Sequence, residues 1–253
     1  MNINVITLPT AVVRQKCINN TFSKFNLNYK FISGIGPEQC SFSVEDNLHY
    51  ITCMNKKFLI NEEEILKNTK RFWLNFGELA AYLAHYFACL NFLDTEDNHI
   101  IICEDDAMPN CDMKLVDDMF NTNPDVHFIN LQATTAHNQQ KYPYTKDLHK
   151  IGDLVKYEKD QMLPLLCEGM TAYAIDKVGA KIYCSFIEKN GYIGPCDVLT
   201  AVLSYNNLLE IYAPYDINQY FFLDPETYKE SYTFFPKTKD ELKFNQITMR
   251  VRE

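Results

Sequence analysis

The sequence predicts a single α/β domain with a mostly parallel central sheet flanked by helices, and three observations lead to that prediction. Its 253 residues are near the upper size for one hydrophobic core. Short β-type runs alternate with segments of helical periodicity, as in chains built from β-α-β units. One such run, 99–103, is almost wholly apolar, as in a strand covered on both faces. We place the domain at 1–236 and interpret 237–253 as a charged C-terminal tail or helix.

The first β-α-β unit occupies the N-terminal part of the chain. A short β-type run covers 3–8, and a second strand is predicted at 29–33, closed by Gly34 and Gly36. Between them, apolar residues recur every three or four positions, which predicts a helix through Val13, Cys17, Ile18, Phe22 and Phe25. A strand, helix and strand in this order favour a parallel pair with a right-handed crossover.

The middle of the chain continues the alternation. From Gly77, a segment rich in Ala and Leu predicts a buried helix on the spacing of Leu79, Leu83, Phe87 and Leu90. The apolar strand 99–103 follows, and then a helix over 112–119 and a strand over 126–131, which extends the parallel sheet. The polar stretch 134–159 lacks a clear period, so we expect a long loop over the site.

The C-terminal third predicts two further helices, each preceded by an aspartate. A strand over 170–175 leads to Asp176, which is placed to cap a helix in which Val178, Ile182 and Phe186 share a face. Asp197 is placed to cap a helix through Leu203, and a strand over 210–213 follows.

Composition excludes several classes of function. A formal charge of -9 and a pI near 5.2 argue against broad nucleic-acid binding and against an anionic membrane surface, since both require a basic face. No run approaches the ~20 apolar residues of a transmembrane helix, and the start 1–8 lacks a secretory signal. The nine cysteines include no Cys-x-x-Cys pair and are expected to be buried thiols. We therefore expect a soluble protein of the cytoplasm or another reducing compartment.

Three acidic residues follow the apolar strand and are the predicted metal-binding and donor-binding residues. The carboxyl ends of parallel strands face the reaction crevice, and Glu104, Asp105 and Asp106 lie at such an end. Adjacent carboxylates repel one another, and Mn²⁺ or Mg²⁺ with oxygen ligands relieves that repulsion while keeping positions open for substrate phosphates. The alternative is a solvated acidic turn after a strand.

An ordered set of segments resembles glycosyltransferase family 25, which includes lipooligosaccharide and collagen hydroxylysine galactosyltransferases. The match spans nearly the whole chain, through 5–8 with Arg14, 31–34, 77–85, 100–106 and 169–180. The resemblance implies a GT-A-type fold, a UDP-sugar donor carrying galactose or glucose, Mn²⁺ dependence and inversion at the anomeric carbon. It also implies a glycan, glycolipid or hydroxylysine-type acceptor.

The resemblance also assigns roles to single residues. It implies that Glu104 and Asp106 hold the metal and that Asp105 contacts the donor sugar or ribose. Thr7, Leu8 and Arg14 correspond to the nucleotide side, where an arginine can meet phosphate with paired N–H donors; the alternative for Arg14 is an exposed helix residue. Ser33 would edge the base, or form a turn.

The proton acceptor and the buried helix carry further assignments. Asp197, in a Pro-x-Asp segment, is the predicted general base, with a helix cap as its alternative role and Glu168 as the second candidate base. His85 is predicted to contact the nucleotide sugar, or else to be a buried structural histidine. The family pattern usually has Gly-Cys and Ser in this helix, whereas this chain has Ala80, Ala81 and Ala84.

Two other functions stay open on the sequence alone. One is a different metal-dependent nucleotide-phosphate enzyme, such as a nucleotidyltransferase. The other is a catalytically silent module that binds a sugar nucleotide, which the three alanines favour. Acceptor contacts are expected from 134–159 and from Tyr220, Phe221 and Phe222, whose aromatic faces suit either a sugar ring or the core. The sequence leaves open whether the chain forms a homo-oligomer.

Overall fold

The computed structural model describes residues 1–69, 75–109, 113–132, 148–150, 170–214 and 221–223. In the first part the elements are β1 (Asn2–Thr7), α1 (Val12–Lys24), β2 (Tyr29–Ser33), the 3₁₀ turn η1 (Pro37–Gln39), β3 (Cys40–Glu45), β4 (Leu48–Cys53), β5 (Lys56–Ile60), α2 (Glu62–Thr69) and α3 (Phe76–Leu93). In the second they are β6 (His99–Glu104), β7 (Ala107–Pro109), α4 (Lys114–Thr122), β8 (Phe128–Asn130), β9 (Leu148–Lys150), β10 (Ala172–Asp176), α5 (Lys177–Asn190), α6 (Cys196–Tyr205), β11 (Tyr212–Pro214) and β12 (Phe221–Leu223).

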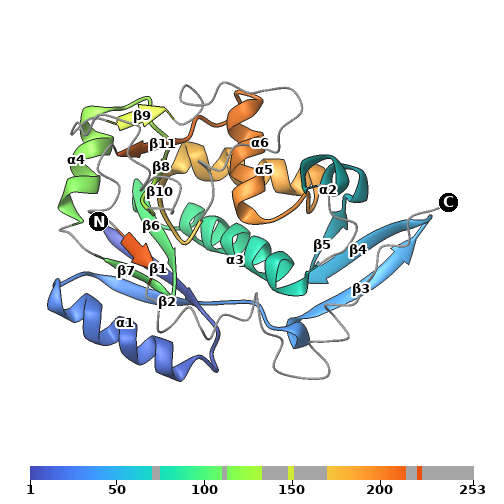
Figure 1. The fold of residues 1–253 in the computed structure, drawn as a ribbon, viewed down its shortest axis with the longest axis horizontal. Helices are drawn as coiled ribbons and strands as arrows, with labels where there is room; N and C mark the ends of the chain where they lie inside the picture. The colour runs from blue at the N-terminus through green and yellow to red at the C-terminus, as the bar shows by residue number, and fades with distance from the viewer. Residues whose placement is uncertain (70–74, 110–112, 133–147, 151–169, 215–220, 224–253) are drawn as a thin grey trace.

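A seven-stranded mixed sheet in the order β2-β1-β6-β10-β8-β11-β9 forms the centre of the molecule (Figure 1). The strand β1 pairs in parallel with both β2 and β6, and β8 pairs in parallel with β11. The strand β10 runs antiparallel between β6 and β8, and β9 runs antiparallel to β11 at the edge. The predicted α/β class with a mostly parallel sheet is confirmed, although the sheet does not continue in parallel through β10.

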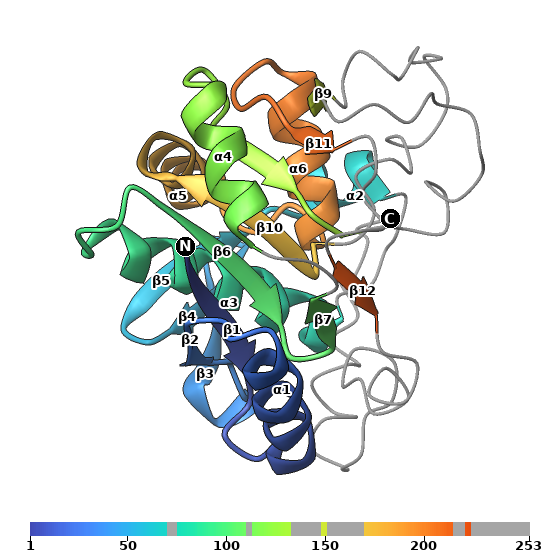
Figure 2. The ribbon, with the colours of Figure 1, turned by 90° about the vertical axis from the view of Figure 1, so that its left-hand side faces the viewer.

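Helices cover both faces of this sheet, because its strands are apolar on both faces (Figure 2). In β6, Ile100 and Ile102 pack in the core shared with α3, α5 and α6. Ile101 and Cys103 point to the other face and pack in the core shared with α1 and α4. This alternation follows from the two-residue period of a strand, and it makes the domain a three-layer α/β/α structure.

Two of the predicted helical faces are confirmed in part: Ile18 and Phe22 of α1 are buried and Ile182 and Phe186 of α5 pack against the core, but the first residue of each run is exposed. In α1, Val13 is 68% exposed, whereas Arg14, Ile18 and Phe22 are buried. In α5, Val178 is 47% exposed, and the fully buried positions include Ala180 and Tyr183. In both helices the buried face thus excludes the first residue of the apolar run.

Several elements were not predicted. The strands β3, β4 and β5 form a separate antiparallel sheet, and α2 follows it. The strand β9 lies within 134–159, where we expected only a loop; the rest of that stretch lies outside the described residues, as does the predicted tail 237–253. Among the helices described, none is long and apolar enough to cross a membrane.

Candidate active site

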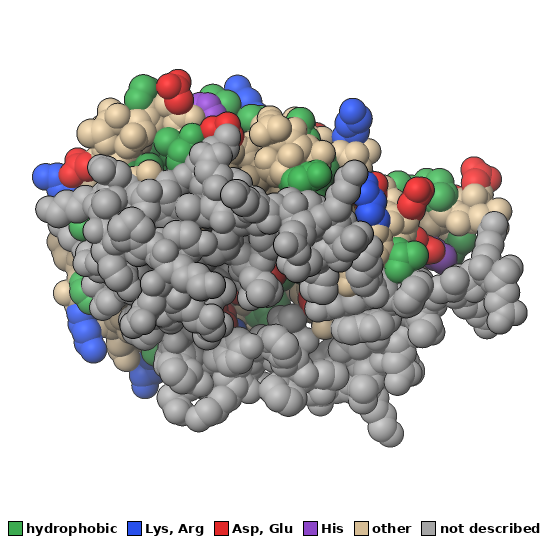
Figure 3. All heavy atoms as spheres, turned by 45° about the horizontal axis from the view of Figure 1, so that its top comes forward, with side chains coloured by type: hydrophobic (Ala, Val, Ile, Leu, Met, Phe, Trp, Pro, Cys, Tyr) green, Lys and Arg blue, Asp and Glu red, His purple; other side chains and the backbone are tan. Residues whose placement is uncertain are grey.

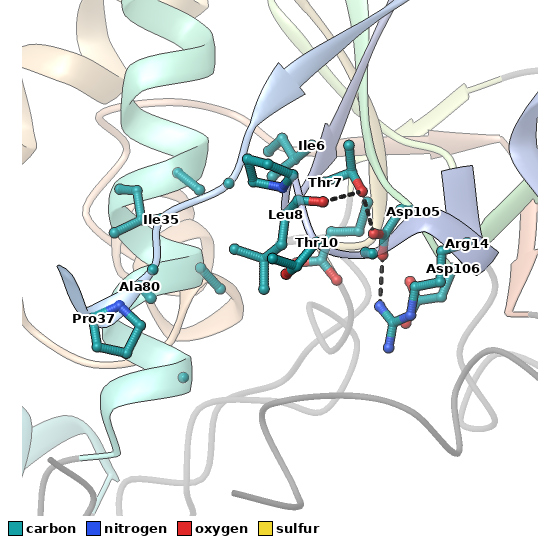
Figure 4. Close-up of a pocket in the computed structure, with 18 of the residues that line it drawn as sticks. Ile6, Thr7, Leu8, Thr10, Arg14, Ile35, Pro37, Ala80, Asp105 and Asp106 are labelled. Carbon is teal, nitrogen blue, oxygen red and sulfur yellow. Dashed lines mark hydrogen bonds and ion pairs between the residues drawn. The ribbon is translucent and has the colours of Figure 1, made fainter. Parts of the chain in front are cut away.

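A cavity of about 500 Å³ opens at the carboxyl ends of β1 and β6 and reaches the start of α3 (Figure 4). One end is polar and carries Thr7, Arg14 and the three acids 104–106. The other end is apolar and is lined by Ile35, Pro37, Phe76 and small residues of α3. On the face that Figure 3 shows, acidic and basic side chains of the described residues lie interspersed. The cavity therefore combines charged and apolar walls within the volume range of small-molecule sites.

The acids lie at this cavity because β6 ends there. The register pairs Glu104 with Ile6, so β1 and β6 reach the crevice together. Asp105 and Asp106 form the turn between β6 and β7, and each is only 5% exposed. Glu104 keeps 33% of its side chain exposed. The prediction that the three acids gather at a strand end facing a cavity is confirmed by this geometry.

Asp105 is held by two partners from the first β-α unit. The Thr7 hydroxyl donates to its Oδ2 at 2.6 Å, and Arg14 Nη1 donates to its Oδ1 at 2.6 Å. Burial raises the pKa of Asp105, and the arginine and the threonine only partly oppose this effect. Burial also acts to lower the pKa of Arg14, but the carboxylates, Asp105 first, outweigh it and raise the pKa above its usual value. Arg14 is thus an ion-paired residue, and its alternative role as an exposed helix residue is wrong.

Asp106 is buried without a comparable partner. Burial, followed by the charge of Glu104, raises the pKa of Asp106 to about 7. Its Oδ1 and the Nη2 of Arg14 are buried atoms without a hydrogen-bond partner in the described part of the chain. A buried polar atom left unpaired is unfavourable unless a ligand or water satisfies it. The site therefore presents one unsatisfied acceptor and one unsatisfied donor.

His85 lies behind Glu104 and not in the cavity wall. The imidazole is fully buried, with Nε2 3.2 Å from Glu104 Oε1 and Nδ1 3.2 Å from the Tyr173 hydroxyl. A carboxylate can only accept, so Nε2–H donates to Glu104, and a neutral ring accepts the Tyr173 proton at Nδ1. Tyr173 is itself fixed by stacking on Phe128, with ring centroids 4.8 Å apart. His85 can thus act on the site through Glu104.

The acids fit a divalent cation of the kind that uses few protein ligands. Within the described residues no group of three or more His, Cys, Asp or Glu side chains could enclose a metal. Mg²⁺ and Mn²⁺ sites of nucleotide enzymes, however, commonly use one or two carboxylates together with substrate phosphates. Glu104 and the unsatisfied Oδ1 of Asp106 supply such a pair. A cation bound to this pair would oppose the effects of burial and of Glu104, which raise the pKa of Asp106.

The apolar end of the cavity was not predicted. The residues that follow β2, from Gly34 to Glu38, line it, as does the start of α3. Gly34 lies against the Thr7 backbone, where an added Cβ would be 3.3 Å from the carbonyl. The glycines 34 and 36 were the available signal, since a paired glycine after a strand end often marks a close backbone approach. Ala80, Ala81 and Ala84, which depart from the family pattern, all line the cavity.

Of the remaining predicted residues, only Leu8 lines the cavity among those described. The Ser33 hydroxyl donates to the Gly34 carbonyl, which supports its turn role. Asp197 is the second residue of α6, because Pro195 is the N-cap, so the predicted cap position is wrong by two residues. Its Oδ1 accepts from the Val198 amide at 2.9 Å, and it does not line the cavity. Asp176, by contrast, caps α5 as predicted, accepting from the Gly179 amide at 2.7 Å.

Other predicted contacts cannot be placed. Glu168 and Tyr220 lie outside the described residues, and so does the side chain of Phe222. Phe221 is fully buried in the core beside α1 and α4, which favours its packing role. Near α6, burial raises the pKa of the Cys196 thiol, and the charges of Glu104 and Asp197 add to this effect. Asp197 and Glu104 therefore both lie within electrostatic range of the same thiol.

Comparison with known proteins identifies the class. The sequence profile described as glycosyltransferase family 25, an LPS biosynthesis protein family, matches residues 1–200. This match covers most of the chain and every described residue that lines the cavity. The chain therefore belongs to glycosyltransferase family 25, and its architecture is the predicted α/β class with a mostly parallel central sheet. No curated protein sequence gives a match.

Solved glycosyltransferase structures show weak similarity. A glycosyltransferase involved in glycosylation of the major capsid of PBCV-1 is 8% identical with a TM-score of 0.34; the alignment covers 74% of this chain and 64% of that one, slightly under two thirds. A mutant Drosophila beta-1,4-galactosyltransferase 7 in complex with manganese, UDP-Gal and xylobiose is 10% identical, with a TM-score of 0.39 and coverage of 100% and 80%. An active-site mutant of LgtC is 10% identical, with a TM-score of 0.40 and coverage of 100% and 85%.

Proposed function

We propose that this glycosyltransferase moves a sugar, galactose or glucose, from a UDP-sugar to an acceptor hydroxyl with the aid of Mn²⁺ or Mg²⁺. The observation that carries the proposal is the buried Oδ1 of Asp106, which has no described hydrogen-bond partner and lies in the same cavity as Glu104. Asp105 is already engaged by Arg14 and Thr7, so Asp106 and Glu104 are left to hold the metal. When bound, the metal would stabilise the charge that grows on the departing diphosphate.

The protein's own residues would orient the donor. Arg14 uses Nη1 on Asp105, so its Nη2 is available to a diphosphate oxygen and would give a charge-assisted hydrogen bond. Asp105 fixes the guanidinium in that orientation and, on this proposal, also reaches a donor ribose or sugar hydroxyl. Thr7 and Leu8 form the wall of the cavity after β1. These contacts would hold the donor against the ends of β1 and β6.

The acceptor side of the proposal rests on the family resemblance. Inversion requires a carboxylate that takes the proton of the attacking hydroxyl, and Asp197 remains our candidate, with Glu168 the second. The charge of Glu104 contributes to the raised pKa of Cys196, the first residue of α6, which supports a position of α6 near the site. The acceptor class stays a glycan, glycolipid or hydroxylysine-type hydroxyl. Proton NMR of the newly formed linkage, compared with the donor anomer, tests inversion directly.

The decisive experiment is donor binding and turnover by the intact chain. UDP should raise the Tm in the presence of Mn²⁺ and much less in EDTA, because a ligand of the folded state stabilises it. Release of UDP from UDP-galactose or UDP-glucose should depend on Mn²⁺ and should be lost in Asp106→Ala. Metal-independent release, or normal release by that variant, would refute the metal role.

A second candidate is a catalytically silent module that binds a sugar nucleotide. The observation that favours it is the position of Ala80, Ala81 and Ala84, which place methyl groups in the cavity wall where the family pattern has Gly-Cys and Ser. The module would show Mn²⁺-dependent binding of UDP-sugars without release of UDP, even at long incubation. A nucleotidyltransferase would instead release pyrophosphate from a nucleoside triphosphate, which the same assay can detect.

A further inference from the structure

Two cysteines face each other across the hairpin beside the cavity. The register of the β3–β4 pair places Cys40 opposite Cys53, at the end of the hairpin away from its turn (Figure 1). Cys40 is partly exposed and Cys53 is fully buried, and both are free thiols. Cys40 directly follows η1, whose Pro37 and Glu38 line the cavity. A bond between the two cysteines would therefore connect the segment next to the cavity wall to β4.

The turn of the hairpin decides the geometry of this pair. Asp46 and Asn47 have φ values of 50° and 65°, so they form a two-residue turn of the I′ kind between Glu45 and Leu48. The residues that flank such a turn exchange both backbone hydrogen bonds, and the two pair types then alternate along the ladder. Counting from Glu45–Leu48, the sixth pair, Cys40–Cys53, is a non-hydrogen-bonded pair.

A non-hydrogen-bonded pair is the closer of the two kinds. Its Cα atoms lie about 4.5 Å apart and its Cβ atoms at the short end of about 4.5–5.5 Å, which approaches the separations found in disulfides. Interaction with Cys53, followed by burial, raises the pKa of Cys40, and interaction with Cys40 lowers the pKa of Cys53. The register and the turn thus place the two cysteine side chains directly opposite each other in the closer kind of pair.

We propose that Cys40 and Cys53 form a redox-sensitive modification site that closes to a disulfide by exchange with a small-molecule disulfide such as oxidised glutathione. In the first exchange, the thiolate of the partly exposed Cys40 attacks the disulfide, forms a mixed disulfide and releases one thiol, which takes up the proton that Cys40 lost. In the second, Cys53 attacks the Cys40 sulfur and releases the other thiol. The two protein thiols lose two hydrogens and two electrons, and the small disulfide gains them as two thiols.

A single tryptic peptide contains both cysteines and can be used to follow this reaction. Trypsin cleaves after Lys30 and Lys56, and the peptide 31–56 contains both cysteines and no others. The folded protein is equilibrated with mixtures of oxidised and reduced glutathione, denatured in N-ethylmaleimide and digested. The expected peptide lacks two hydrogens and carries no maleimide, and its formation should raise the Tm of the intact protein by about 5 °C.

Three controls separate the native geometry from chance oxidation. Denatured protein should need a ratio of oxidised to reduced glutathione at least about tenfold higher for half-closure. Cys53→Ser should stop at a glutathione adduct on Cys40, and Cys40→Ser should give no closed peptide. The buried thiols of Cys89 and Cys184 also interact, but both are at most 4% exposed and should stay reduced. Recovery of peptide 31–56 with two maleimides, or equal closure in denatured protein, would overturn the proposal.

Discussion

Replacing Asp106 with asparagine should stabilise the metal-free protein while removing the metal site that we propose. Asp106 is 5% exposed, and its pKa rises from the ordinary value of 3.8 to about 7 on folding. Since one pKa unit corresponds to about 1.36 kcal/mol, ionised Asp106 opposes folding by about 4 kcal/mol at pH 8. Water entry and relaxation reduce such penalties, so we expect Asp106→Asn to raise the free energy of unfolding by about 2 kcal/mol.

The pH dependence gives the sign of this effect independently. A carboxyl group whose pKa is raised on folding favours the folded state at low pH, and this contribution is lost as the pH rises from about 4 to about 7. The stability of the wild-type protein should therefore fall relative to Asp106→Asn across that window. Below pH 4 the two proteins should converge, because the carboxyl group is then neutral in both states.

Urea unfolding in EDTA at pH 4, 6 and 8 measures the difference. Asp118→Asn is the matched control, since Asp118 is exposed on α4 and should change stability by less than about 0.5 kcal/mol at any of these pH values. Saturating Mn²⁺ and UDP should reverse the order, stabilising the wild type but not Asp106→Asn. If Asp106→Asn were less stable than the wild type at pH 8 in EDTA, Asp106 would have a stabilising partner and the reasoning would be wrong.

Four further predictions concern neighbouring residues. Arg14→Met should cost about 3–5 kcal/mol of unfolding free energy in urea, because it strands buried Asp105, and adding Asp105→Asn should recover most of that loss. His85→Leu should weaken Mn²⁺ binding by about 10–100-fold in EPR titrations, whereas His85→Gln, which keeps a donor toward Glu104, should recover part of it. Ala81→Phe should fill the cavity and abolish UDP-induced stabilisation with little change in the Tm of the free protein. Asp197→Asn should lower kcat far more than donor affinity, and a loss confined to the KM for the donor would remove it as base.

The sequence identified the central strands well because they are short, apolar and bounded by strong signals. The strand at Tyr29–Ser33 ends at Gly34 and was predicted to the residue. The β3–β5 sheet was missed because its two tight turns, Asp46-Asn47 and Met54-Asn55, lack glycine although all four residues have positive φ. Non-glycine residues adopt positive φ values infrequently, so two-residue turns usually contain glycine, as in Asn-Gly or Asp-Gly. Neither turn has such a pair, and the hairpins were therefore not recognised.

The candidate site divides in the same way. The acids 104–106 could be predicted because an apolar strand fixes where they emerge, and topology then requires a crevice there. Which of the three acids forms an ion pair could not be predicted. That depends on the contact of Arg14 in α1 with Asp105, which lies 91 positions away in the sequence. His85 was predicted to contact the donor, but its hydrogen-bond partners are Glu104 and Tyr173. These two residues belong to β6 and β10, whose pairing the sequence analysis did not predict.

The helix α3 shows that helical periodicity predicts a buried helix but does not tell whether a given side of it contacts the core or a cavity. Its spacing predicted a buried helix, and Leu79, Leu83 and Phe87 are indeed buried. In the sequence, alanines 80, 81 and 84 are departures from the family pattern that remove a hydroxyl before His85, and in the fold all three line the cavity. Because methyl groups neither hydrogen-bond nor occupy much space, these alanines can select a ligand only by its shape, whereas the polar end offers hydrogen bonds and charge. Substitutions at these alanines should therefore change which ligands fit, whereas substitutions at 104–106 should change whether any phosphorylated donor binds.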